Sequence, residues 1–318
     1  MTSLRHVIQL LRPGDWVKNV FVLPAVVAAV AAYPEDFDVA ASLVRGAVAV
    51  GAFCLLASGV YAINDVVDAA SDRRHPIKRH RPVASGAVSA ASAVSLGIVL
   101  IIVALVTAFA VNSNLGLVLS LYAVLQAAYN VKLKRVIFVD AVVVAIGFGL
   151  RAAAGAVAIG VGISVWLVLC VFFLCLYLAF IKRLCDISSA EKGDGGQWHT
   201  AAGYDDRAEL NWLLGVSAVL AVMTYLLYSL SEHARAIFGD RTIGFALMTP
   251  LVLIAVHRFY RRANSGASDS PLAALRDDRA VLASIGLFAI GSLVILYEKH
   301  VPQILQAIFA DTKSLGIP

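Results

Sequence analysis

The stretch "NDVVDAASDRRHPIKRHR", which begins at Asn64, carries three aspartates and five lysines or arginines between two long apolar segments. On a helix that turns about 100° per residue, one arc of about 100° contains four oxygen-bearing side chains: Asn64, Asp65, Asp68 and Asp72. Three carboxylates this close repel one another unless a cation lies among them. Hard oxygen ligands suit Mg²⁺, which proteins bind through one or two carboxylates together with substrate phosphates. We therefore predict that these four residues hold Mg²⁺.

A basic turn follows the acidic residues. Pro76 is expected to end the helix, and Lys78, Arg79 and Arg81 come directly after it. A metal ion beside such a turn is typical of a pyrophosphate site, where lysine and arginine neutralise the charge that the metal leaves. The alternative is a solvated loop whose bases only set membrane topology. That alternative explains the bases and not the three aspartates in register, because acids contribute little to topology.

A second charged segment, "AFIKRLCDISSAEKGDGG", ends a later apolar run. On a helix, Lys182, Arg183 and Asp186 share an arc of about 100°. The mixed charge suits a second anionic group better than a second pair of metal ions. The alternative is a lysine–arginine pair that only extends its charges to the membrane surface.

Four other polar residues flank apolar segments and are candidates to bind substrate. Tyr129 and Lys134 lie in "YNVKLKR", and Lys18 and Asn19 lie in "RPGDWVKN". Each also has a simpler interpretation, as an aromatic residue or a charge that marks the membrane boundary. Both interpretations stay open for all four.

Arg151 lies deep inside an apolar run. A charge within the membrane is by default functional or paired internally, and the sequence leaves that choice open. Asp140 is eleven residues away, which is too far along one helix for a direct ion pair with Arg151.

These residues are positioned by long apolar segments. Of the 318 residues, 60% are hydrophobic and 15% are charged, against about 25% charged in soluble domains. A spanning helix needs roughly 20 apolar residues, and helices satisfy their own backbone groups in lipid. We predict an all-α polytopic membrane protein, a single domain over 1–318, whose nine transmembrane helices surround a cytoplasm-facing polar cavity: about 19–33, 43–64, 88–111, 114–131, 137–160, 164–181, 211–230, 241–260 and 280–298.

The distribution of lysine and arginine predicts orientation. With a cytoplasmic N-terminus, the outer segments hold only Arg235, Arg241, Lys299 and Lys313. We therefore expect an inner (plasma) membrane protein with its active site in the cytoplasmic loops 65–87 and 182–210.

The remaining segments carry no predicted chemistry. We expect 1–18 to form an interfacial amphipathic helix, 262–280 to be a polar linker, and the tail after 300 to contain a short amphipathic helix. No apolar run precedes Pro13, so no cleavable signal peptide is expected. The four cysteines show no metal or redox spacing and are expected to pack in apolar surroundings. The net charge of +5 needs no nucleic-acid partner, because no basic face on a soluble fold is predicted.

The segment 64–86 resembles the first aspartate-rich motif of the UbiA superfamily of membrane prenyltransferases. The resemblance covers essentially the whole chain, and its details are similar to the decaprenyl-phosphate phosphoribosyltransferase branch. That branch has RPxxWxKN, HPxKxxRP, YxxxxLK, RxxAG and KRxxE motifs, which this chain matches around Trp16, His75, Tyr129, Arg151 and Lys182. Two departures stand out: Asp186 replaces the glutamate of KRxxE, and Lys182 replaces the first aspartate of the second DxxxD motif of aromatic prenyltransferases.

The resemblance implies a reaction, a metal and partners. Phosphoribose would move from phosphoribosyl pyrophosphate (PRPP) to a polyprenyl phosphate in the bilayer, releasing pyrophosphate, for cell-envelope polysaccharide precursors. The three aspartates and Asn64 would hold Mg²⁺ on the leaving group, which Lys78 and Arg81 would neutralise. Lys134, Lys182 and Arg183 would hold the donor or lipid phosphate.

Two alternatives to this reaction stay open. One is an aromatic prenyltransferase that uses a polyprenyl diphosphate, and the other is a non-catalytic carrier of anionic lipids. A homo-oligomer is compatible with the sequence.

Overall fold

The computed structural model describes residues 4–32, 35, 38–74, 78–192, 203–204, 206–267 and 270–309. Within these ranges the secondary structure is entirely helical. Nine helices there are long and apolar enough to cross a membrane: Leu4–Ala32, Val39–Val67, Ala90–Val111, Ser113–Val131, Val139–Ile159, Val165–Ser188, Arg207–Leu230, Arg241–Asn264 and Arg279–Tyr297. The predicted all-helical, multi-pass membrane architecture is confirmed, while the direction in which a polar cavity opens stays a prediction.

The chain divides into two compact units. The first consists of Met1–Val30, Pro34–Leu133 and Gly147–Ser164. It holds α1 (Leu4–Leu11), η1 (Pro13–Val22), α2 (Leu23–Ala32), α3 (Val39–Val67), α4 (Ala69–Asp72), η2 (Lys78–His80), α5 (Ala90–Val111) and α6 (Ser113–Val131). The second consists of Ala31–Tyr33, Lys134–Ile146 and Val165–Pro318. It holds α8 (Val165–Lys192), α9 (Arg207–Leu230), α10 (Glu232–Phe238), α11 (Arg241–Leu247), α12 (Thr249–Asn264), α13 (Pro271–Asp277), α14 (Arg279–Tyr297) and α15 (Val301–Ile308). The short η3 (Leu133–Arg135), α7 (Val139–Ile159) and the end of α2 contribute residues to both units.

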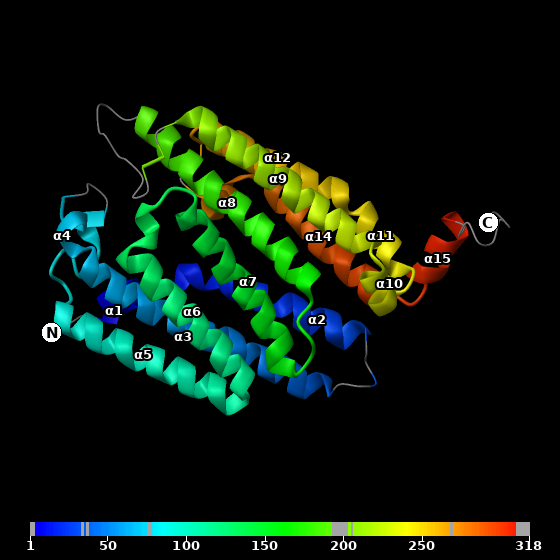
Figure 1. The fold of residues 1–318 in the computed structure, drawn as a ribbon, viewed down its shortest axis with the longest axis horizontal. Coiled ribbons are helices and arrows are strands. Elements are labelled where there is room, and N and C mark those ends of the chain that lie inside the picture. The colour runs from blue at the N-terminus through cyan, green and yellow to red at the C-terminus, as the bar shows by residue number, and fades with distance from the viewer. Residues whose placement is uncertain are drawn as a thin grey trace. The chain divides into compact units, whose positions relative to one another are not determined.

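In the first unit, α3 packs along α5 (Figure 1). A Cβ atom added to Gly59 would lie 2.6 Å from the carbonyl oxygen of Gly97, so the two backbones touch where both side chains are absent. Small residues that let helices approach closely are typical of packing in membranes. This contact fixes the half of α3 that ends in the acidic residues.

The first predicted span is an α-helix only from Leu23 onward. Residues 13–22 form a 3₁₀ helix, and Arg12 before it has a left-handed backbone (φ 50°). Gly155 of α7 lies so close that an added Cβ atom would be 1.9 Å from the carbonyl oxygen of Val22. The predicted span at about 19–33 lies within the candidate span Leu4–Ala32, and its first residues, up to Val22, are 3₁₀ helix.

In the second unit, α8 packs against α9 and α12, and α12 packs against α14. The Tyr177 hydroxyl on α8 donates to the carbonyl oxygen of Val256 on α12 at 2.6 Å. The helix α8 continues to Lys192, so the start of the predicted loop 182–210 is helical. That longer helix carries Lys182, Arg183 and Asp186 at regular helical spacing.

The predicted polar linker at 262–280 is partly wrong. It contains α13, whose Ser270 hydroxyl accepts a hydrogen bond from the backbone N–H of Ala273 at 3.2 Å, with Pro271 at the first helical position. Serine at the N-cap followed by proline is a helix start signal, and interpreting the segment by polarity alone missed it. The predicted tail helix is present as α15.

Some predictions fall outside the described residues. The helix end expected at Pro76 does, as does most of the second loop after Lys192. The four cysteines are free thiols, and Cys175 and Cys185 are buried.

Candidate functional site

Two aspartates of the first motif share one arginine. Arg81 Nη1 donates to Asp72 Oδ2 at 2.8 Å and lies 3.4 Å from Asp65 Oδ1. Arg12 Nη2 also donates to Asp65 Oδ1. Both aspartates are buried, at 1% and 4% exposure. The structure thus brings Arg81 of the basic turn into contact with Asp65 and Asp72 of the acidic motif.

The local backbone explains why Asp65 and Asp72 meet. Asp68, where α3 ends, keeps a right-handed conformation (φ −88°, ψ −5°), and α4 follows at once. The chain therefore continues almost as one helix, and residues seven apart return to the same face after two turns. Asn64 and Asp68 are half-buried on the same segment, and their place around a metal stays a prediction.

Sequence reasoning named Arg12 only as part of a motif, but the structure places it on the acidic cluster. Its guanidinium lies over the Tyr61 ring, 4.9 Å from the centroid. Ser58 of α3 accepts from Trp16 Nε1 at 3.0 Å and donates to the carbonyl oxygen of Leu11 at 2.8 Å. These contacts tie the junction of α1 and η1 to α3, so Arg12 is held against Asp65.

The donor set of this cluster fits a divalent cation in part. Among the described residues, no group of three or more carboxylate, histidine or cysteine side chains is close enough together to form a metal site. Instead, oxygens of Asp65 and Asp72 converge on one cationic nitrogen of Arg81. Two carboxylates that already share a cationic partner match the way Mg²⁺ is held, with substrate phosphates completing its shell. The predicted site of four protein ligands stays a prediction.

Three other predicted residues of this region are cations. Lys78 and Arg79 are exposed on η2, where Arg79 Nε donates to His80 Nε2 at 3.3 Å. Lys18 pairs with Asp15 on η1, with 2.5 Å between its Nζ and Oδ1. Exposed cations of this kind remain accessible to an anionic substrate.

Arg151 is buried and paired internally. It donates to Asn19 Oδ1 at 2.8 Å, to the Tyr122 hydroxyl at 2.8 Å and to the carbonyl oxygen of Gly147 at 3.0 Å. Its guanidinium also lies within 5.5 Å of the ring centroids of Phe53, Tyr122 and Phe148. The sequence left open whether Arg151 is functional or paired internally, and the structure shows internal pairing. Its partner Asn19 is itself a residue that was predicted to bind substrate. The pair fastens η1 to α7.

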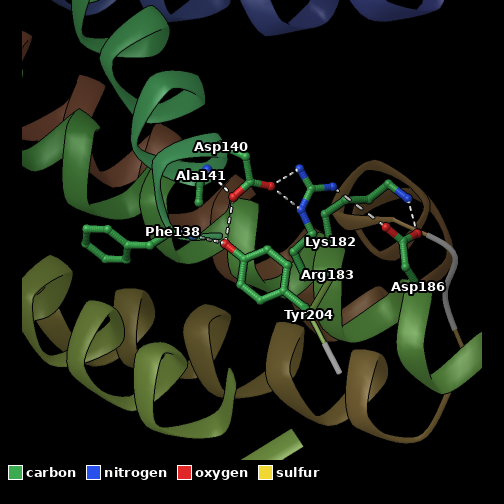
Figure 2. A network of polar contacts seen from close by, with 7 residues as sticks. All are labelled: Phe138, Asp140, Ala141, Lys182, Arg183, Asp186 and Tyr204. Atoms are coloured by element: carbon green, nitrogen blue, oxygen red, sulfur yellow. Dashed lines mark hydrogen bonds and ion pairs between the residues drawn. The ribbon is translucent and has the colours of Figure 1, made fainter. Parts of the chain in front are cut away.

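A second polar network lies in the other unit (Figure 2). Asp140, fully buried, accepts from Arg183 Nε at 2.9 Å and Nη2 at 2.7 Å, from the Tyr204 hydroxyl at 2.6 Å and from the backbone N–H of Ala141 at 2.7 Å. The Tyr204 hydroxyl in turn accepts from the backbone N–H of Phe138 at 2.8 Å. Burial, and then the bond to the Asp140 carboxylate, raise the pKa of Tyr204. A neutral tyrosine and a charged pair therefore form one connected network.

Sequence reasoning gave Asp140 no partner and did not consider Tyr204. The sequence did place the Asp140 carboxylate inside a predicted span, and a charge there needs a partner. The predicted shared arc on α8 is confirmed, because Lys182 pairs with Asp186 and Arg183 Nη1 lies 3.8 Å from it (Figure 2). Lys182 is the more exposed of the two cations, at 42% of its side chain against 17% for Arg183.

Tyr129 and Lys134 are both half-buried. Tyr129 ends α6 in the first unit, while Lys134 belongs to the second. Their role in substrate binding stays a prediction.

Comparison with known proteins gives consistent results. The profile of the UbiA prenyltransferase family matches residues 21–269. A protein of Mycolicibacterium smegmatis named decaprenyl-phosphate phosphoribosyltransferase is 36% identical over 90% of this chain and 90% of its own length. A protein of the same name from Mycobacterium tuberculosis is 32% identical over 85% of this chain and 88% of its own length.

A solved structure shares the fold. It is a UbiA homologue from Archaeoglobus fulgidus bound to GPP and Mg²⁺, with a TM-score of 0.65 and 20% identity, covering 95% of this chain and 99% of that one. At this identity the likeness concerns the fold alone.

Proposed function

The chain belongs to the UbiA prenyltransferase family, and on this premise we propose that it transfers 5-phosphoribose from PRPP to a polyprenyl phosphate and releases pyrophosphate. The observation that carries the proposal is the near full-length match, at 32–36% identity, to proteins named for this activity. The replacement of an aspartate by Lys182 in the second motif supports it, since a second carboxylate pair for metal is missing there.

The cluster in the first unit suits a pyrophosphate leaving group. The two buried carboxylates and the arginines Arg12 and Arg81 balance one another in charge. A bound Mg²⁺ would lie on Asp65 and Asp72 and lower the negative charge of the departing pyrophosphate. The arginines would then exchange carboxylate oxygens for phosphate oxygens, where their forked donors bind well. Lys78 and Arg79, exposed on η2, would add positive charge.

The acceptor needs no strong general base. A phosphate monoester is already ionised at neutral pH, so its oxygen attacks C1 of the ribose as the bond to pyrophosphate breaks. The transition state gains positive charge on the sugar and negative charge on the leaving group, and placed charges stabilise it. The protein's task is then to position two anionic substrates rather than to move a proton.

The second network supports a second phosphate position. Asp140 and Tyr204 hold Arg183 in place, while Lys182, on the same arc of α8, extends a more exposed ammonium. We assign Lys182, Arg183 and Lys134 to the 5-phosphate of the donor or to the lipid phosphate, with the site on the cytoplasmic side of the inner membrane. Asp186 would keep Lys182 oriented until the anion arrives.

The test is a transfer assay with the purified full-length protein in detergent. Labelled PRPP is supplied with decaprenyl phosphate, and a parallel assay supplies 4-hydroxybenzoate with a prenyl diphosphate. We expect label in the lipid only in the first assay, sensitive to EDTA. Asp72→Asn should remove most of this transfer, whereas the matched control Asp277→Asn, at an exposed aspartate, should not. Product only in the second assay would overturn the proposal in favour of aromatic prenylation.

A further inference from the structure

A cavity of about 390 Å³ lies at the C-terminal end of α12, within the second unit. Its lining contains three arginines and one aspartate: Arg258, Tyr260, Arg261, Arg262, Asn264, Ser265, Ala267 and Asp278. None of the residues predicted to bind substrate or metal is among them. With three guanidinium groups and one carboxylate, the lining has an excess of two positive charges.

Two of the three arginines are held by one carboxylate, whereas Arg261 is exposed. Asp278, whose side chain is 2% exposed, accepts from Arg258 Nη2 at 2.7 Å, and Arg262 Nη1 lies 3.7 Å away. The other Asp278 oxygen accepts from the backbone N–H groups of Ala280 and Val281 at 2.8 Å and 3.1 Å, at the start of α14. The carboxylate that organises the two arginines is thus itself fixed by a helix start.

Part of the donor capacity of this lining is unused. The Nε atoms of Arg258 and Arg262 are buried and have no hydrogen-bond partner among the described residues. Arg261 has no ion pair with any carboxylate in the part of the chain that the structure describes. A buried donor without an acceptor is costly, and an anion in the cavity would supply the missing acceptors.

Asn264 of the lining is bonded to α9. Arg207 Nη2 donates to Asn264 Oδ1 at 2.9 Å and contacts Ser188 Oγ of α8 at 3.3 Å. The end of α12 is therefore tied both to α14 and to α9.

We propose that this cavity is a second binding site that takes a phosphate group, with Arg258, Arg261 and Arg262 as its ligands. Guanidinium forks match phosphate oxygens in geometry and charge. A phosphate group at the end of a membrane-spanning helix has two sources, the headgroup of an anionic lipid or a soluble phosphate. The site is distinct from the residues assigned to the transfer reaction.

The experiment measures binding rather than transfer, so it does not depend on the proposed reaction. The full-length protein in a non-ionic detergent is titrated with phosphatidylglycerol, phosphatidylcholine and inorganic phosphate, and binding is followed by native mass spectrometry. Arg261→Gln is compared with wild type and with Arg279→Gln. Arg279 is also exposed at the same helix junction and does not line the cavity, so the two variants lose the same charge.

We expect the wild type and Arg279→Gln to bind phosphatidylglycerol or inorganic phosphate alike, and Arg261→Gln to bind about tenfold more weakly, as the loss of one charge-assisted hydrogen bond predicts. Preference for phosphatidylglycerol identifies a lipid headgroup, and preference for inorganic phosphate identifies a soluble ligand. If neither anion binds the wild type, or if Arg261→Gln and Arg279→Gln bind equally, the proposed site does not exist.

Discussion

Arg81 and a divalent cation compete for the same two carboxylates. In the structure, one nitrogen of Arg81 lies 2.8 Å from Asp72 and 3.4 Å from Asp65. Replacing Arg81 by methionine keeps much of the side-chain length and removes the charge. We therefore predict that Arg81→Met raises the affinity of the substrate-free protein for Mg²⁺ while it lowers phosphoribosyl transfer.

The magnitude follows from Coulomb's law. A dication coordinated by these oxygens would lie roughly 5 Å from the guanidinium, and the repulsion at that distance is about 2 kcal/mol even with the dielectric constant of water. Both carboxylates are buried, so this is a lower limit. The expected gain in Mg²⁺ affinity is therefore about tenfold or more.

The assay is isothermal titration calorimetry with Mg²⁺ on the full-length protein without substrate. Arg279→Met serves as the control, because it removes an exposed arginine outside the cluster. The variant's melting temperature should also rise more with Mg²⁺ than that of wild type, since Asp72 has lost its arginine and only Arg12 still pairs with Asp65. Unchanged or weaker Mg²⁺ binding in Arg81→Met would refute the argument that these carboxylates are a metal site.

Three further predictions concern positioning and stability. Tyr204→Phe removes the hydroxyl bond to Asp140 and should lower the free energy of unfolding by about 1–2 kcal/mol, measured by denaturant titration in micelles. Gly155→Ala places a Cβ atom against main chain and should cost about 1–3 kcal/mol, whereas Gly286→Ala, with no atom within 4 Å, should be tolerated. Burial raises the pKa of Asp278, but its hydrogen bonds lower that pKa more and hold it below its usual range. The stabilisation that the ionised Asp278 carboxylate gives the fold should persist above about pH 4 and be lost as the pH falls through the lowered pKa. In Asp278→Asn the melting temperature should therefore fall less steeply as the pH is lowered.

Hydropathy was sufficient to predict the spanning helices, because lipid requires each segment to satisfy its own backbone. Helix geometry also predicted that Asp65 and Asp72 share a face, and that Lys182 and Asp186 do. Both predictions depend only on spacing within one helix. They needed no knowledge of how the helices pack.

Contacts between elements were not predictable in the same way. Arg12 reaches Asp65, and Tyr204 reaches Asp140, from positions 53 and 64 residues away. No spacing rule relates such positions, since packing between helices decides them. The same holds for Arg151, where the sequence required a partner and Asn19 provides it from 132 residues away.

The charge balance of the first cluster also constrains the order of binding. Asp65 and Asp72 neutralise Arg12 and Arg81 within the protein, so neither a lone cation nor a lone anion enters without leaving a buried charge unpaired. Metal and pyrophosphate together restore the balance, because the metal takes the carboxylates and the arginines take the phosphate oxygens. Coupling between two ligands is reciprocal, so we expect the Mg²⁺ complex of pyrophosphate to bind wild type more tightly than free pyrophosphate does. In Arg81→Met this preference should shrink, and calorimetry with both forms of the ligand would show it; an equal preference in the two proteins would mean that the arginine does not exchange partners.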